Sequence, residues 1–236
     1  MVINIGNFPI CRLTFAAMSG EIQHILEMSQ YGQWQGDRAM KLREFNHKHA
    51  ERVFAMTAAD AYELQRALKL DPNFTSAVGE VRSGPGGGVD ATDFTVTFFM
   101  IAAMIDGTRR DIASRVWEYW HAVTVCSVLA SYDTSELSLI ACELTGRSLF
   151  GDAVSSILEN PDYADKVIEI GVNRNLRRAW IKFRSDKGER VTHFARQETA
   201  SDHIASADGT LSVSAVIGGN AVRRIAHDTI SDASAS

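Results

Sequence analysis

The spacing of apolar residues is weakly periodic before residue 56, helical from there to about residue 160, and typical of strands after it. The helical signal is strongest at residues 92–105, where Phe94, Phe98 and Ile101 stand among other apolar residues. A helix that is apolar on nearly every face is buried on several sides. Thr92 or Asp90 can cap its first turn. We therefore expect a buried central helix.

A glycine-rich run precedes this helix, and an aromatic segment follows it. Residues 83–88 read SGPGGG, a composition that predicts a turn, because glycine tolerates positive φ and proline lacks a donor. Val81 and Val89 on either side suggest a small hairpin. Residues 108–111 match a capping box, and helical spacing continues from there to about residue 130.

Capping and breaking residues mark the other expected helices. A Thr57 cap and the Asp71-Pro72 pair bound the first helix of the sharper pattern, and Gly146 closes a later one. The expected helices are residues 57–70, a short helix or turn at 73–78, and residues 134–145, 148–159 and 219–230.

The last third of the chain reads as strands. Residues 179–184 alternate apolar and polar side chains, and residues 185–189 join them to residues 190–194 as a hairpin. Further strands are expected at 167–172 and 211–217. The expected fold class is α+β: a helical N-terminal part with a winged-helix-like hairpin, then a small antiparallel sheet with a terminal helix.

These elements suggest four segments: an arm at residues 1–55, a helical winged-helix-like domain at 56–160, a small antiparallel α+β module at 162–231 and a tail at 232–236. Residues 41–54 within the arm have the pattern of a basic helix. The arm is either a mobile segment or the product of an over-long gene assignment, with translation starting at Met56. The mass of the natively expressed protein separates the two interpretations.

Composition and charge narrow the function only slightly. The chain has 236 residues, 45% of them hydrophobic and 22% charged, and a net charge of −5, so any nucleic-acid surface must be local. The three cysteines show no paired spacing, and no apolar run reaches membrane-span length. We expect a cytoplasmic protein with reduced thiols and no membrane partner.

Residues 57–105 resemble a MerR-like winged helix-turn-helix in their order of helix, short helix, glycine turn and helix. The resemblance covers about a fifth of the chain, which lacks the aromatic and arginine residues usual between recognition helix and wing. The pattern is also similar to that of uncharacterised proteins of phages and integrative elements. The resemblance implies DNA binding and transcription regulation.

Local basic clusters point to the same function. Lys182 and Arg184 share one face of the predicted hairpin with Trp180, a mixture of cations and ring that suits phosphate and base contact. Double-stranded DNA is therefore the expected partner, and ordinary solvated charge is the alternative. The expected nucleic-acid-binding residues are Arg82, Arg109, Arg110, Arg174, Arg177, Arg178, Lys182, Arg184, Lys187 and Arg190.

Two other functions remain open. One is a protein-interaction module, an inhibitor or adaptor, anchored by Trp117, Tyr119 or Trp180. The other is an enzyme with a dispersed site, although no catalytic motif is present and we expect no enzymatic activity. The pairs His47/His49 and Glu21/His24 do not form a metal-ligand set, so we expect no metal or cofactor. A homodimer is an open alternative to a monomer.

Overall fold

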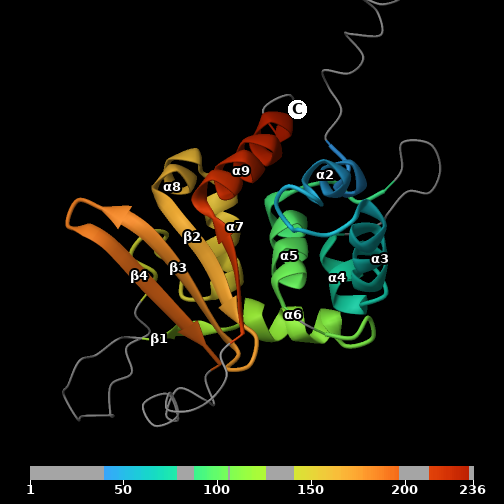
Figure 1. Cartoon of the computed structure of the whole chain (residues 1–236), viewed down its shortest axis with the longest axis horizontal. Coiled ribbons are helices and arrows are strands. Elements are labelled where there is room, and N and C mark those ends of the chain that lie inside the picture. The colour runs from blue at the N-terminus through green and yellow to red at the C-terminus, as the bar shows by residue number, and fades with distance from the viewer. Residues whose placement is uncertain (1–39, 79–87, 106, 126–140, 197–212, 234–236) are drawn as a thin grey trace, which may run out of the picture. The chain divides into compact units, whose positions relative to one another are not determined.

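A computed structural model describes residues 40–78, 88–105, 107–125, 141–196 and 213–233, all within a single folded unit (Figure 1). In these residues, eight helices and a five-stranded antiparallel sheet form, and the last element is a helix. The predicted α+β class with a terminal helix is confirmed.

The elements follow in a helical half and a mostly stranded half. The helices are α2 (Leu42–His49), α3 (Ala58–Leu68), α4 (Pro72–Val78), α5 (Asp93–Met104), α6 (Ile112–Trp120), α7 (Phe150–Glu159), α8 (Pro161–Lys166) and α9 (Gly219–Ala233). The strands are β1 (Val123–Val125), β2 (Val167–Asn173), β3 (Arg178–Ser185), β4 (Gly188–Ala195) and β5 (Ser214–Gly218), in the sheet order β1-β4-β3-β2-β5.

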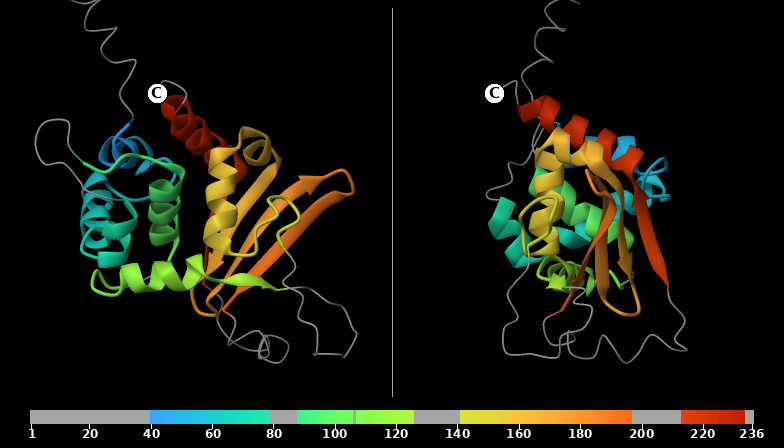
Figure 2. Two further views of the ribbon diagram at one scale, coloured as in Figure 1. Left: turned by 180° about the vertical axis from the view of Figure 1, so that it is seen from behind. Right: turned by 90° about the vertical axis from the view of Figure 1, so that its left-hand side faces the viewer.

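Helix α5 is the buried centre of the fold, as its apolar sequence predicted. The Thr92 hydroxyl oxygen caps it by accepting a hydrogen bond from the Thr95 backbone N–H, and the Thr95 hydroxyl oxygen accepts one from the Thr92 backbone N–H. Phe98, Phe99 and nearly every other residue of α5 are buried. The helix lies between α3 and α7, and α6 crosses its lower end (Figures 1 and 2). One hydrophobic core therefore runs from α2 to α9.

The sheet buries one face against helices and leaves the other without a helix among the described elements. Ile170, Ile181 and Ile217 lie in register on the buried face, which α7, α8 and α9 cover (Figure 1). Trp180 and Lys182 alternate with the buried residues and lie on the opposite face. The alternation predicted for this hairpin is confirmed, including the inward positions of Ile181 and Phe183.

Residues 40–55, which the sequence placed in the arm, are part of this core. Helix α2 lies within the predicted residues 41–54 but ends at His49, and its Leu42 and Phe45 are fully buried. The amide of Asn46 donates a hydrogen bond to the Gln65 side chain at 3.2 Å, which joins α2 to α3. The fold therefore uses residues upstream of Met56.

The prediction that the aromatic helix continues to residue 130 is wrong. Helix α6 ends at Trp120, and residues 123–125 form the edge strand β1, paired with β4. Val123-Thr124-Val125 is a β-branched run, which favours strands, and a neighbouring strand is available to pair with it. The start is also later than predicted: Thr108 donates to the Asp111 carboxylate at 2.8 Å, but the helix begins at Ile112.

Two further predicted elements, a helix and a hairpin, lie only partly within the described residues. The helix expected at residues 134–145 is wrong from residue 141 onward, because residues 141–149 form turns, with Gly146 at a φ of 70°. The glycine hairpin falls at residues 79–87, outside the described residues. On its described side, Val89 and Ala91 hydrogen-bond to Leu42 and Met40. The winged-helix resemblance stays a prediction.

Gly151 packs closely against Trp120 where helices α6 and α7 meet, and it gives a test of this packing. A Cβ at Gly151 would lie 2.1 Å from Cδ2 of the buried Trp120 ring. Helix propensity favours Gly151→Ala by about 1 kcal/mol, but overpacking costs roughly 1–3 kcal/mol. We expect a lower urea midpoint for Gly151→Ala and little change for Gly218→Ala, where an added Cβ meets nothing within 4 Å. Equal midpoints for the two variants would contradict the packing.

A polar cluster ties α2 to α9 and makes stability depend on pH. Nε2 of the buried His49 and Nζ of Lys48 each lie 2.8 Å from the Asp228 carboxylate. Burial lowers the pKa of His49 below 6.5, although its hydrogen bond to Asp228 opposes the shift. Burial would raise the pKa of Asp228, but the hydrogen bonds from Lys48 and His49 outweigh it and lower that pKa.

The lowered pKa of His49 means that the unfolded chain takes up a proton there before the folded chain does. Stability contributed by His49 is therefore present above pH 6.5 and is lost as the pH falls below it. We expect the free energy of unfolding to fall between pH 7.5 and 5.5, with a smaller fall in His49→Gln. The control His47→Gln removes an exposed imidazole of the same helix. If His49→Gln keeps the full pH dependence, the buried cluster is not its source.

Candidate functional site

Two of the expected DNA-contacting arginines, Arg174 and Arg177, make contacts that join the helices to the sheet. Nε of Arg174 donates a hydrogen bond to the carbonyl oxygen of Met104, at the end of α5, over 2.8 Å. Arg177 pairs with Glu118 of α6 at 3.2 Å. Both arginines belong to the turn between β2 and β3. The half-buried Arg178 follows at the start of β3, in register with Ala195. The arginines at this end of the hairpin therefore make contacts within the fold.

The other basic residues of the hairpin lie near its far end. Lys182 and Glu189 form an ion pair at 2.6 Å, and this contact raises the pKa of Lys182 and lowers that of Glu189. Arg184, Lys187 and Arg190 are exposed near Asp186 at the tip. The two turns stand at opposite ends of eight-residue strands, roughly 25 Å apart at about 3.3 Å per residue. One local contact cannot include both groups.

Arg109 and Arg110, just before the start of α6, lie in a third place. Arg109 pairs with Glu63 of α3 at 3.1 Å, and Arg110 is exposed in the same turn. Arg82 lies outside the described residues. The expected set is therefore spread over three places, and Arg109, Arg177 and Lys182 each have a carboxylate partner.

Two of the three aromatic anchors considered for a protein partner, the buried Tyr119 and the half-buried Trp117, make hydrogen bonds within the fold. The hydroxyl of the buried Tyr119 donates to the carbonyl oxygen of Asn173 at 2.8 Å, and burial raises its pKa to about 12. Trp117 packs among aromatic rings and donates to Asp71 at 3.2 Å. Trp180 remains partly exposed on the open face of the sheet, where its indole N–H donates to Glu169 at 2.9 Å.

A hollow of about 220 Å³ lies where the start of α2, one face of α3 and residues Gly88 and Val89 meet. We call it the cationic hollow, since four of its lining side chains are cations. The lining residues are Lys41, Arg43, Tyr62, Gln65, Arg66, Lys69, Gly88 and Val89. None of these cations was among the expected DNA contacts.

Local structure brings the wall of the cationic hollow together. The Leu42 N–H donates to the Val89 carbonyl oxygen at 2.8 Å, so the chain after the glycine run lies against the start of α2. Along α3, Tyr62, Arg66 and Lys69 follow at four- and three-residue steps, which places them on one helix face. The α2–α3 hydrogen bond described above keeps the two helices in place beneath the hollow.

The charge of the cationic hollow is only partly compensated. Lys41 forms a close ion pair with Asp90. Arg43, Arg66 and Lys69 make no ion pair with any carboxylate in the residues that the structure describes. The guanidinium of Arg43 lies 5.3 Å from the centre of the Tyr62 ring, a cation–π contact. Three cations and one aromatic ring thus face a shared space.

The size and lining of the cationic hollow favour anion binding over catalysis. Its volume of about 220 Å³ lies below the roughly 300–1,000 Å³ of pockets for drug-sized ligands. Its wall carries no carboxylate, imidazole or thiol to act as an ordinary general base or nucleophile. The site fits a phosphate-sized anion.

Two negative findings apply to the described ranges alone. They contain no group of three or more His, Cys, Asp or Glu side chains placed to hold a metal ion. None of their helices combines the length and apolar character needed to cross a membrane.

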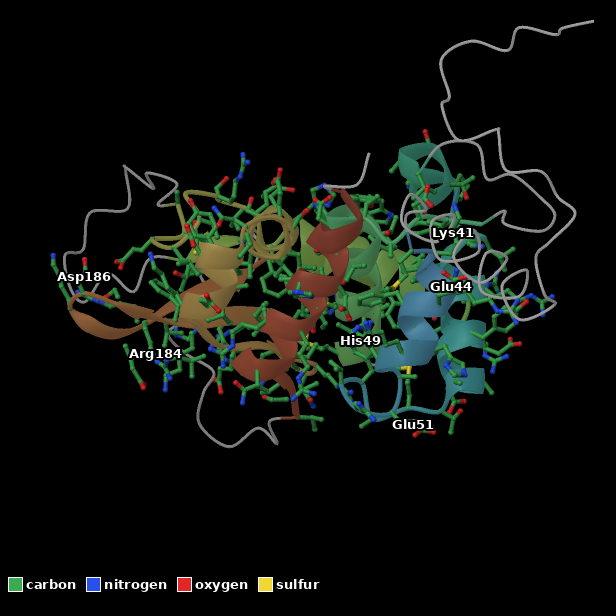
Figure 3. The ribbon with its side chains drawn as sticks, turned by 90° about the horizontal axis from the view of Figure 1, so that it is seen from above. Lys41, Glu44, His49, Glu51, Arg184 and Asp186 are labelled. Carbon is green, nitrogen blue, oxygen red and sulfur yellow. The ribbon has the colours of Figure 1, made fainter. Side chains whose placement is uncertain are left out.

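Lys41 lies at the start of α2, on the side of the folded unit opposite Arg184 and Asp186 of the hairpin tip (Figure 3). The cationic hollow and the tip are therefore separate basic surfaces. A signal for the hollow existed in the sequence, because Tyr62, Arg66 and Lys69 have the spacing of one helix face. The contribution of Lys41 and Arg43 depends on the distant pairing of residues 40–42 with 89–91, which has no local signal.

Comparison with known proteins gives no relative from which to transfer a function: no family model, no curated protein and no solved structure matches the chain.

Among the expected DNA contacts, replacing an arginine that is bonded within the fold should lower stability more than replacing an exposed one. Arg174→Ala removes a charged donor from the Met104 carbonyl, and we expect a loss of about 1.5–3 kcal/mol in the free energy of unfolding. Arg110→Ala changes an exposed side chain and should stay within about 0.5 kcal/mol of the wild type. Urea denaturation measures both. A neutral Arg174→Ala would contradict the linking role of this side chain.

Proposed function

We propose that this protein binds nucleic acid and contacts the phosphate backbone through the cationic hollow. The observation that carries the proposal is the convergence of Lys41, Arg43, Arg66 and Lys69, from two helices, around one concave surface. Phosphates are held by arginine and lysine side chains, and such contacts supply most of the sequence-independent affinity for nucleic acid. The winged-helix resemblance implies a more specific role. The protein would be a DNA-binding regulator, such as one of a phage or other mobile element.

The cationic hollow supports this function better than the hairpin tip does. At the tip, Lys182 is paired with Glu189, and Asp186 adds a further negative charge. In the hollow, only Lys41 has a carboxylate partner among the described residues. A protein with a net charge of −5 repels nucleic acid over most of its surface, so a local excess of cations decides where a strand binds.

If the proposal is correct, removing cations from the hollow lowers both the affinity for DNA and the dependence of that affinity on salt. In Arg66→Ala/Lys69→Ala, we expect weaker binding of a labelled DNA duplex, because two phosphate contacts are lost. The slope of log affinity against log salt should decrease by about 0.9 for each contact. Fluorescence anisotropy from 50 to 200 mM salt measures both effects.

The matched control is Arg184→Ala/Lys187→Ala, which removes the same number of charges from the exposed hairpin tip. It should keep nearly the wild-type affinity and slope. Failure of the wild type to bind duplex or single-stranded DNA at 50 mM salt would contradict the proposal. An equal loss in both double variants would show a general charge effect instead of a site in the hollow.

A second candidate is a protein-interaction module that uses the open face of the sheet. Val191 and Val216 are 44% and 49% exposed there, on the face that also carries Trp180. Partly exposed aromatic and aliphatic side chains on one face suit a protein contact. A purified protein that retains a stoichiometric protein partner, lost in Trp180→Ala but kept in Arg66→Ala/Lys69→Ala, would favour this function.

A further inference from the structure

We infer that the cationic hollow holds an unpaired nucleotide, whose base stacks on Tyr62 while its phosphates contact Arg66 and Lys69. This inference rests on the proposed function and narrows the ligand to single-stranded nucleic acid. Tyr62 is 48% exposed and shares its helix face with both cations. Exposed aromatic rings between cations are the feature by which proteins bind single strands without reading their sequence.

The neighbours of Tyr62 fix the position of its ring in a way that suits stacking. Arg43 lies over Tyr62 at 5.3 Å, so the ring already carries one planar cation and a base can stack on its exposed part. The neighbouring Ala61 and Gln65 are buried and fix α3 against the core. A stacking platform of this kind needs little reorganisation when the ligand binds.

The size of the hollow also favours a single strand over a duplex as the ligand that contacts Tyr62. A hollow of about 220 Å³ is too small to admit a paired helix, so a duplex can reach its cations with backbone phosphates but cannot place a base in it. Bases in a duplex are stacked on each other and cannot reach Tyr62. A base contact at this site therefore requires an unpaired nucleotide.

Tyr62→Leu tests the base contact without changing charge, and Tyr62→Phe keeps the ring as the matched control. We expect Tyr62→Leu to bind a 12-nucleotide single strand about tenfold more weakly, with an unchanged salt slope, and Tyr62→Phe to bind as the wild type does. Binding of an abasic strand of the same length and of a duplex should be equal in all three proteins. Circular dichroism confirms that each variant is folded.

The outcomes separate this inference from the proposed function. If Tyr62→Leu binds the single strand as the wild type does, or loses duplex and abasic-strand affinity equally, stacking at Tyr62 is overturned while phosphate binding stands. If the wild type binds none of the three ligands at 50 mM salt, the proposed function fails, and the inference fails with it. Selective loss of the base-bearing single strand supports both.

Discussion

Burial of α5 on all of its sides is the constraint on which the rest of the structure depends. A helix without a polar face must be covered in every direction, and here α3 and α7 cover its two sides while α6 packs across its end (Figure 1). Phe94 and Phe98 extend its surface into the ring cluster with Trp117 and Trp120. The helical half and the sheet half therefore share one core.

That shared core also determines what the basic residues can do. Arg174 and Arg177 lie where the β2–β3 turn meets the helices, and their contacts with Met104 and Glu118 connect the two halves. Cations at a junction stabilise it and are less available to a ligand. Arg43, Arg66 and Lys69, on α2 and α3, line the hollow without a carboxylate partner among the described residues and remain available to an anion.

The sequence predicted the elements well and the candidate site poorly, and the reasons are physical. The cap at Thr92, the alternation of residues 179–184 and the terminal helix are local signals, and the structure confirms them. The edge strand β1 was missed because Val123–Val125 continues a helical apolar pattern and becomes a strand only by pairing with β4. The hollow was missed because Arg43 and Arg66 meet through tertiary packing of α2 on α3.

The most direct measurement of the central claim is ultraviolet crosslinking of the wild-type protein to a bound oligonucleotide, with the modified peptides identified by mass spectrometry. An exposed tyrosine beside the phosphate contacts should carry the adduct. The account predicts adducts on the α3 peptide that contains Tyr62. Adducts confined to the β3–β4 hairpin, with an unmodified α3 peptide, would contradict it.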